Sequence, residues 1–237
     1  GNAGGNNGEF YTPRSIIKLI VDIVDPQIGQ TIYDPAAGSC GFLIEAYHHM
    51  RPQVKTDSEL EKLNHGTFYG NEKTPLAYIM GVMNMILHGI SAPNISNADT
   101  LATTIKDIQE SDRHDIILAN PPFGGKIKEQ IQINFPFRTN ATEMLFLQHI
   151  YKMLKDEEKR GLSYLSGPLQ YWGSIQKHQK GNPRKLQPPY DYLTSCLSIS
   201  PNAGVKTNII FFDRIGSTRD IWYYEINLGR TLTKNKP

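Results

Sequence analysis

The sequence lacks most features that mark a disulfide-stabilised, metal-binding or membrane protein. Its 237 residues contain two cysteines, Cys40 and Cys196, which form neither a disulfide framework nor a metal-ligand spacing, and its seven histidines are scattered. No apolar run approaches the roughly 18 residues of a membrane span, and no charged and then apolar leader opens the chain. We therefore expect a cytoplasmic protein without a metal centre.

An excess of charge of one sign is missing as well. Lys and Arg total 25 against 23 Asp and Glu, which gives a formal net charge of +2. This excess is too small to indicate nucleic-acid binding by itself, so a DNA-acting protein of this composition would need a local basic surface or a partner. With 237 residues and 39% hydrophobic residues, the chain can bury a core, and its length suits one large domain or a domain and a half.

What the sequence does contain is an alternation of apolar runs with two different periods. Helical spacing recurs over 13–24, 42–50, 76–90 and 142–155, and strand-like runs occupy 31–33, 66–72, 94–101 and 114–119. Strands that alternate with helices predict an α/β fold with a mostly parallel, doubly wound sheet. The aromatic and β-branched runs at 207–214 and 220–226, joined by a short Gly-Ser turn, predict a final antiparallel hairpin.

Two stretches depart from this pattern. Residues 1–8, "GNAGGNNG", are rich in Gly and Asn and are predicted to be a flexible lead-in to a single domain over 9–237. Residues 161–200 crowd Gln, Pro, Ser, Tyr and Lys together with neither period. The simplest interpretation of this second stretch is a surface insertion or a disordered loop.

Candidate ligand-binding residues follow four of the predicted strands, whose carboxyl ends share one edge in such a sheet. Asp34 opens the small-residue loop "DPAAGSCGF", which allows close approach of a ligand to the backbone but is equally typical of a tight strand-to-helix connection. Glu72 could accept both hydroxyls of a ribose, or be a helix N-terminal charge. Asp99 could accept from an adenine amino group, or form an Asx turn or N-cap.

The fourth loop, Asn-Pro-Pro-Phe at 120–123, is the most specific. The Asn120 side-chain carbonyl and the Pro121 backbone carbonyl, stiffened by Pro122, can both accept hydrogens from one planar amino group. Two acceptors help the nitrogen lone pair leave conjugation as it attacks an electrophile. Phe123 can stack on a base flipped out of a duplex, which offsets part of the unstacking cost, on the order of 1 to 3 kcal/mol.

Six stretches in this order carry a resemblance to a known family. They read "GEFYTPR", "DPAAGSCGFL", "GNEKTPLAYIMGVMNMILHGI", "ADTL", "HDIILANPPFG" and "GVKTNIIFFD". Together they resemble the modification (methyltransferase) subunit of type I restriction-modification systems, a family of adenine-specific DNA methyltransferases. The resemblance implies a Rossmann-like methyltransferase fold, S-adenosylmethionine as cofactor, and DNA, a specificity subunit and a restriction subunit as partners.

The resemblance also implies roles for individual positions. The methionine part of the cofactor would lie along Tyr11, Thr12 and Pro13. The cofactor loop would comprise Asp34, Ala36, Gly38 and Ser39. Glu72 would hold the ribose, and Asp99 with Thr100 would face the cofactor adenine. The substrate base would be held by Asn120, Pro121, Pro122 and Phe123.

The sequence departs from the family pattern at three places. Cys40 stands where the family loop has glycine, and a side chain there costs cofactor affinity if the position needs a positive φ. A redox or nucleophilic role for the Cys40 thiol has no neighbouring His or Lys to support it. The family's helical N-terminal domain and C-terminal helices are absent from these 237 residues. Residues 174–192, read in a shifted frame, permit a family-like helix and strand, which suggests a frameshift.

Three functions are compatible with these patterns. The leading one is methyl transfer to the amino nitrogen of a flipped adenine in DNA. The same chemistry could act on RNA or on a protein amide instead. The third is a catalytically impaired subunit that binds partners or DNA, for which Cys40 and the 161–200 stretch are the evidence.

Overall fold

The computed structural model describes residues 12–122 and 126–155 and the strands at 163–168, 193–199, 207–212 and 222–225, with side chains in these strands described only for 209–212. The predicted lead-in, the 174–192 frameshift segment, Tyr11 and Phe123 lie outside the described residues. Within this part of the chain no helix is long and apolar enough to span a membrane.

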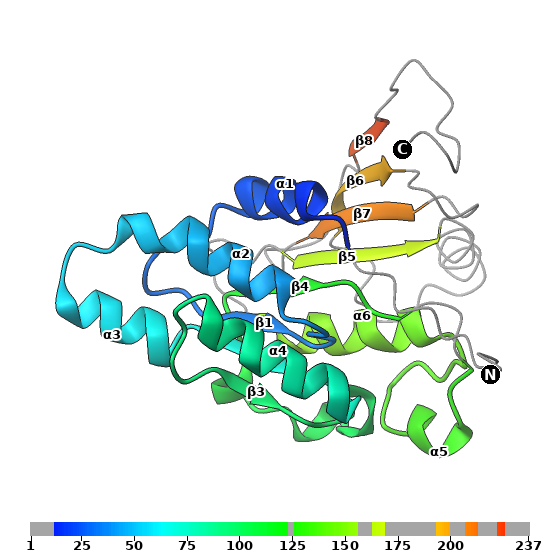
Figure 1. The fold of residues 1–237 in the computed structure, drawn as a ribbon. Coiled ribbons are helices and arrows are strands. Elements are labelled where there is room, and N and C mark those ends of the chain that lie inside the picture. The colour runs from blue at the N-terminus through cyan, green and yellow to red at the C-terminus, as the bar shows by residue number, and fades with distance from the viewer. Residues whose placement is uncertain are drawn as a thin grey trace, which may run out of the picture.

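The described strands form one eight-stranded sheet in the order β3-β2-β1-β4-β5-β7-β6-β8 (Figure 1). The strands are β1 (Ile32–Asp34), β2 (Phe68–Asn71), β3 (Asn94–Ser96), β4 (Ile116–Ala119), β5 (Ser163–Pro168), β6 (Leu193–Ile199), β7 (Thr207–Phe212) and β8 (Trp222–Glu225). The five strands from β3 to β5 run parallel, and β7 runs antiparallel to both of its neighbours. The sheet is therefore mostly parallel, as the alternation of periods predicts.

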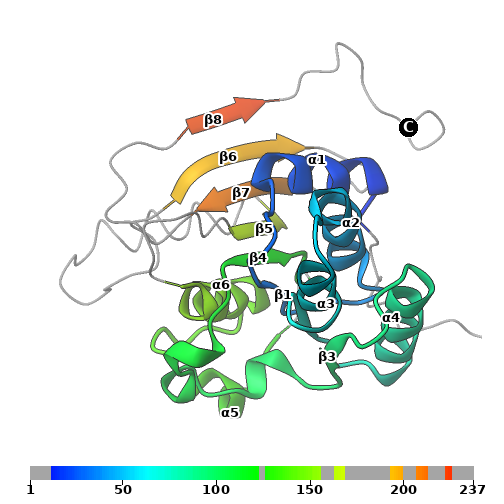
Figure 2. The same ribbon diagram turned by 90° about the vertical axis from the view of Figure 1, so that its left-hand side faces the viewer.

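Helices lie on both faces of the parallel part of this sheet, as Figure 2 shows. On one face lie α1 (Arg14–Val24), α2 (Gly41–Met50), α3 (Asp57–His65) and α4 (Pro75–Leu87); on the other lie α5 (Glu129–Gln132), α6 (Thr142–Met153) and the short 3-10 helices η2 (Thr100–Ala102) and η3 (Ile105–Asp107). Each layer buries its own core: Ile116 and Leu118 of β4 face the first, and Ile117 and Ala119 face the second. The predicted α/β, doubly wound fold is confirmed.

The predicted final hairpin of 207–214 with 220–226 is wrong. β7 pairs with β5 on one side and β6 on the other, and β8 lies beyond β6, to which it is parallel. The physical reason is the burial of β7: Ile209 and Phe211 enter one core while Ile210 and Phe212 enter the other. A strand that is apolar on both faces is best buried in the interior of a sheet, with a partner along each edge.

The structure of segment 161–200 also differs in part from the predicted surface insertion or disordered loop. Its two ends form β5 and β6, and β5 continues the parallel sheet beside β4. A surface insertion or disordered loop over the whole stretch is therefore wrong at these two strands. Residues 169–192 between them lie outside the described residues.

The longest helix that the sequence analysis does not predict is α3. The helix α3 begins after Thr56, whose hydroxyl accepts from the Glu59 backbone N–H at 3.2 Å while the Glu59 carboxylate accepts from the Thr56 N–H at 3.0 Å. This reciprocal capping box is readable as Thr-x-x-Glu in the sequence. It is the local signal that identifies α3, whose apolar pattern buries only Leu63.

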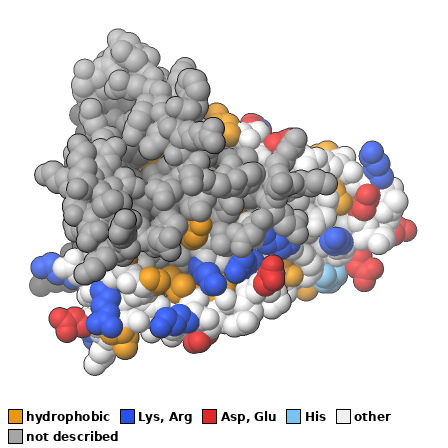
Figure 3. Space-filling model, turned by 180° about the vertical axis from the view of Figure 1, so that it is seen from behind, with side chains coloured by type: hydrophobic (Ala, Val, Ile, Leu, Met, Phe, Trp, Pro, Cys, Tyr) orange, Lys and Arg blue, Asp and Glu red, His pale blue; other side chains and the backbone are white. Residues whose placement is uncertain are grey.

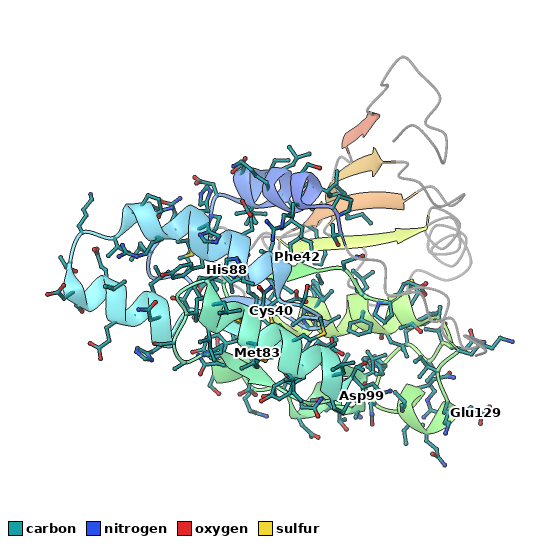
Figure 4. All side chains as sticks on the ribbon, viewed as in Figure 1. Cys40, Phe42, Met83, His88, Asp99 and Glu129 are labelled. Carbon is teal, nitrogen blue, oxygen red and sulfur yellow. The ribbon has the colours of Figure 1, made fainter. Side chains whose placement is uncertain are left out.

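The helix α4 leaves much of its apolar surface uncovered by the described residues. Its fully buried positions are Gly81 and Met85. Six large apolar side chains of this helix are 48–81% exposed, among them Met83, which is labelled in Figure 4: Leu76, Ile79, Met80, Met83, Ile86 and Leu87. Among the described residues, α4 therefore packs against the rest of the protein mainly through the face that carries Gly81 and Met85.

Candidate functional site

The strand register brings the four predicted loops to one edge of the sheet. Asp34 at the end of β1 lies opposite Gly70 of β2, and Asn71 lies opposite Ser96 of β3. On the other side of β1, Tyr33 lies opposite Ile117 of β4, three residues before Asn120. The chain therefore leaves β1, β2, β3 and β4 at neighbouring points, as expected for parallel strands.

The first loop, 35–40, turns back tightly between β1 and α2. The Ala37 N–H donates to the Asn71 carbonyl at 2.9 Å, and the Cys40 N–H donates to the Ala37 carbonyl at 2.7 Å. Gly38 has a positive φ of 51°, and no atom of the described residues lies within 4 Å of the position that a Cβ would occupy there. The loop thus presents open space above its backbone, where a ligand can approach closely.

Cys40 has the positive φ that would disfavour a side chain at this position of the loop. It is the N-cap of α2 with φ 61° and ψ 27°, in the left-handed region that favours glycine. Its side chain is completely buried (Figure 4), and burial, followed by the nearby Asp34 and Glu72 carboxylates, raises the pKa of its thiol. A thiol held protonated and buried is a poor nucleophile, so the reactive-cysteine alternative has no support.

The helix α4 holds this loop through two residues that the sequence analysis missed. A Cβ at Gly81 would lie 2.6 Å from the Gly38 carbonyl oxygen and 2.7 Å from Sγ of Cys40. One turn further on, the Asn84 side chain donates from Nδ2 to the Ser39 carbonyl at 2.9 Å. The available signal was the lone glycine in an otherwise apolar helix, which typically marks close packing.

Glu72 connects the first loop to the second. Its Oε2 accepts from the Gly38 N–H at 2.9 Å, and its Oε1 accepts from the Thr74 N–H at 2.7 Å, at the start of α4. Glu72 thus lies at the N-terminus of α4, as one of its two interpretations expects, and also beside the open face of Gly38. The remaining lone pairs of its carboxylate can accept hydroxyl hydrogens.

Asp34 lies beneath the same loop and is almost completely buried. Its Oδ1 accepts from the Ala36 N–H at 3.0 Å. Burial raises the pKa of its carboxyl to about 7, and the charge of Glu72 adds to this effect, whereas the hydrogen bond from Ala36 opposes it. Asp34 therefore changes its charge in the neutral pH range.

The third loop is anchored to the first. Asp99 caps η2, since its Oδ1 accepts from the Leu101 N–H at 3.1 Å, and its Oδ2 lies 2.8 Å from Nζ of Lys73. The N-cap interpretation of Asp99 is confirmed. The buried Thr100 hydroxyl donates to the Pro35 carbonyl at 2.6 Å, which fastens the two loops together.

Behind these loops lies a buried polar cluster that no sequence motif indicated. The Tyr33 hydroxyl accepts from Nδ2 of Asn71 at 3.0 Å and lies 3.3 Å from Nε2 of His149 on α6. Burial lowers the pKa of His149 to about 4, so its ring is neutral at pH 7. The cluster links β1, β2 and α6 directly below the strand ends.

Asn120 extends from β4 toward the segment that precedes α1. Its Nδ2 donates to the Thr12 hydroxyl at 2.8 Å, and this bond fixes the direction in which the amide oxygen faces. That oxygen, Oδ1, is buried and accepts no hydrogen bond from any described residue. Pro121 is buried, while Pro122 and Pro13 are exposed. An unsatisfied buried acceptor costs free energy unless a ligand donates to it.

The chain was compared with protein families and with known proteins. The family model described as "N-6 DNA Methylase" matches residues 1–236. The EcoEI type I methylase subunit of Escherichia coli is 35% identical over 231 residues, covering 94% of this chain and 46% of that protein. The EcoKI type I methylase subunit of E. coli strain K12 is 28% identical over 236 residues, covering 92% of this chain and 44% of that protein.

Solved structures give a similar result. A chain from a structure described as the basis of complex assembly and conformational transition of the type I R-M system superposes with a TM-score of 0.84 and 39% identity. The match covers 97% of this chain and 48% of that one. The chain thus spans about half the length of the relatives that it matches.

Proposed function

The chain belongs to the N-6 DNA methylase family, and from this premise we propose that it is the modification subunit of a type I restriction-modification system. Its reaction is the transfer of a methyl group from S-adenosylmethionine to the N6 amino group of a flipped adenine in DNA. The observation that carries the proposal is the buried, unpartnered Oδ1 of Asn120 at the edge where the loops after β1, β2 and β3 meet.

The residues at this edge fit S-adenosylmethionine. The open face of Gly38 leaves room for close approach, Glu72 can accept the ribose hydroxyls, and the loop of Asp99 lies beside both. When bound, the cofactor would supply an electrophilic methyl group on a positively charged sulfur, with a neutral thioether as its leaving group. We infer that Asp34, whose carboxyl is buried beneath the loop with a raised pKa, responds to this positive charge.

The chain's own contribution to the transfer is to orient the amino group. Thr12 accepts from Nδ2 of Asn120, so Oδ1 faces the site and can accept one amino hydrogen. The Pro121 carbonyl, held by Pro122, can accept the other. Both contacts strengthen as the nitrogen lone pair leaves the ring and attacks, so they favour the transition state over the ground state. One amino hydrogen then leaves as a proton.

We expect cofactor affinity to depend on the ionisation of Asp34. Since the pKa of Asp34 is raised to about 7 in the free protein, its ionised fraction grows as the pH rises through 7. A cationic ligand favours the ionised carboxylate, so its affinity should increase by about tenfold between roughly pH 6 and pH 8. Isothermal titration calorimetry with S-adenosylmethionine measures this dependence. Asp34→Asn should bind more weakly and show a flat profile; a flat profile in the unsubstituted chain would contradict the assignment.

The function itself is tested by a labelling experiment. The chain, its cognate specificity subunit, duplex DNA and methyl-labelled S-adenosylmethionine are incubated together, and nucleosides are analysed by mass spectrometry. We expect labelled N6-methyladenine. Label in RNA or in a protein amide would replace the proposed substrate. Absence of cofactor binding by calorimetry would instead favour an impaired binding subunit, for which the left-handed Cys40 is the structural argument.

A further inference from the structure

A loop rich in unpaired positive charge follows the Asn120 motif. We call residues 126–141 the basic flap. It carries three exposed cations, Lys126, Lys128 and Arg138, and one acidic side chain, Glu129. Within the described residues none of the three cations forms an ion pair. Their charge is therefore not neutralised by any of the described residues.

Some cations elsewhere on the described surface are paired with carboxylates, whereas others, among them Arg51 and Lys62, are not. Lys18 pairs with Asp22 at 3.0 Å, and Lys155 pairs with Asp115 at 3.0 Å. Lys73 pairs with Asp99 beside the site. Because the whole chain has a net charge of only +2, an interaction with a polyanion has to rely on a local surface such as the basic flap.

The backbone of the flap brings its charges together. Lys126 forms an antiparallel bridge with Ala141, and the Ile127 N–H donates to the Asn140 carbonyl at 3.2 Å. Because the two ends of the flap run antiparallel, the chain moves away from this bridge in the same direction from Lys126 to Lys128 as it does from Ala141 back to Arg138. Lys128 and Arg138 therefore lie on the same side of the bridge, and Lys128 is two residues from Lys126.

The flap is also anchored to the rest of the site. Nδ2 of Asn134 donates to the carbonyls of Leu101 and Ala102 at 3.2 and 3.1 Å. Gln148 of α6 accepts from the Phe137 N–H at 2.9 Å and donates to the Phe137 carbonyl at 2.9 Å. A surface that is already ordered loses little conformational entropy when a ligand binds.

The position of the flap relates it to the substrate base. It begins six residues after Asn120, and Asn134 fastens it to the loop that carries Asp99. Figure 4 places Glu129 of α5 at the end of the molecule beyond Asp99, far from α3. From behind, Lys and Arg side chains gather at this same end, at the lower left of Figure 3.

We propose that the basic flap binds the phosphate backbone of DNA next to the flipped adenine, with Lys126, Lys128 and Arg138 each neutralising a phosphate. The inference rests on the proposed function, since it assigns the DNA contact of the same site. Lysine and arginine contacts to phosphate hold the duplex in register without reading its sequence. This division suits a chain in which a separate subunit would select the site.

The salt dependence of DNA binding tests the proposal. The full chain is titrated into a fluorescent 30-base-pair duplex at several salt concentrations, and the slope of log affinity against log salt is measured. Each phosphate contact contributes about −0.9 to this slope. In the triple variant Lys126→Gln, Lys128→Gln, Arg138→Gln the slope should be less steep by about 2.7. Between 50 and 200 mM salt the variant should therefore lose about forty-fold less affinity than the original chain.

The matched control removes three exposed cations from the opposite end of the molecule, with Arg51→Gln, Lys55→Gln and Lys62→Gln around α3. It should keep the original slope. An unchanged slope in the flap variant, or no DNA binding by the unsubstituted chain, would overturn the inference. Calorimetry with S-adenosylmethionine is run in parallel. If the unsubstituted chain does not bind the cofactor, the result counts against the proposed function. If the flap variant keeps both the original slope and its methylation activity, the result counts against the role of the flap alone.

Discussion

We expect the Asn120→Ala variant to lose the proposed methyl transfer while it retains the cofactor. The substitution removes Oδ1 of Asn120, a buried acceptor that receives no hydrogen bond from the described residues, and with it one of the two proposed contacts that strengthen as the adenine nitrogen attacks. Removal of a single preorganised electrostatic contact in an active site typically costs about 10²- to 10³-fold in rate. The rate of label transfer into DNA measures the loss, and calorimetry with S-adenosylmethionine should give a dissociation constant within about threefold of the original.

A matched asparagine provides the control. Asn94 is exposed at the start of β3 and donates to the His65 carbonyl at 2.8 Å, away from the carboxyl ends of the strands. Asn94→Ala should keep full transfer activity. A second substitution, Asn120→Gln, retains the amide but displaces it by one methylene, and should also lose transfer. Normal methylation by Asn120→Ala, in a protein that unfolds at the usual temperature, would remove Asn120 from the site.

The Gly81→Ala variant is expected to lose stability and cofactor affinity together. Alanine in a helix interior is normally more stable than glycine by roughly 0.5–1 kcal/mol. At Gly81 the new Cβ would lie 2.6 Å from the Gly38 carbonyl oxygen and 2.7 Å from Sγ of Cys40, so α4 must move away from the loop. Overpacking of this kind costs about 1–3 kcal/mol, and displacement of Gly38 from Glu72 should weaken S-adenosylmethionine binding by about tenfold or more.

Urea unfolding and calorimetry measure the two effects. Gly66→Ala is the matched control: Gly66 ends α3 at φ −124°, and its nearest neighbour to an added Cβ is the Lys62 carbonyl oxygen at 3.5 Å, an ordinary contact. It should change the free energy of unfolding by less than about 0.5 kcal/mol. A Gly81→Ala protein that is more stable than the original and binds the cofactor equally well would show that the loop does not depend on α4.

Local sequence patterns were sufficient for most of the elements near the site. The helix that begins at Arg14 follows from apolar residues at helical spacing after Pro13, and β4 follows from an apolar run that Pro121 must end. The ends of β1, β2, β3 and β4 were placed at one edge because strands alternated with helices, which forces parallel pairing. These inferences use neighbours within one element, where side-chain period and backbone chemistry act directly.

The position of the last strands could not be obtained in the same way. The runs containing Ile209 and Trp222 are separated in the sequence by a short Gly-Ser stretch and look alike in composition, so a hairpin is the natural expectation. The choice of neighbours for β7 depends on β5 and β6, which come from a stretch with neither period. A strand buried on both faces has no amphipathic pattern that would report its partners.

By itself, the sequence determined α1, α2, α4, α6 and the strands β1 to β4, together with the chemical groups at the ends of these strands, because both depend on residues close together along the chain. Only the tertiary structure decided how those groups are held. The amide of Asn120 is turned by Thr12, which is 108 residues away in the sequence, and the loop of Gly38 is held by Gly81 and Asn84 of α4. Contacts of this kind depend on strand order and helix packing, and no local period encodes them.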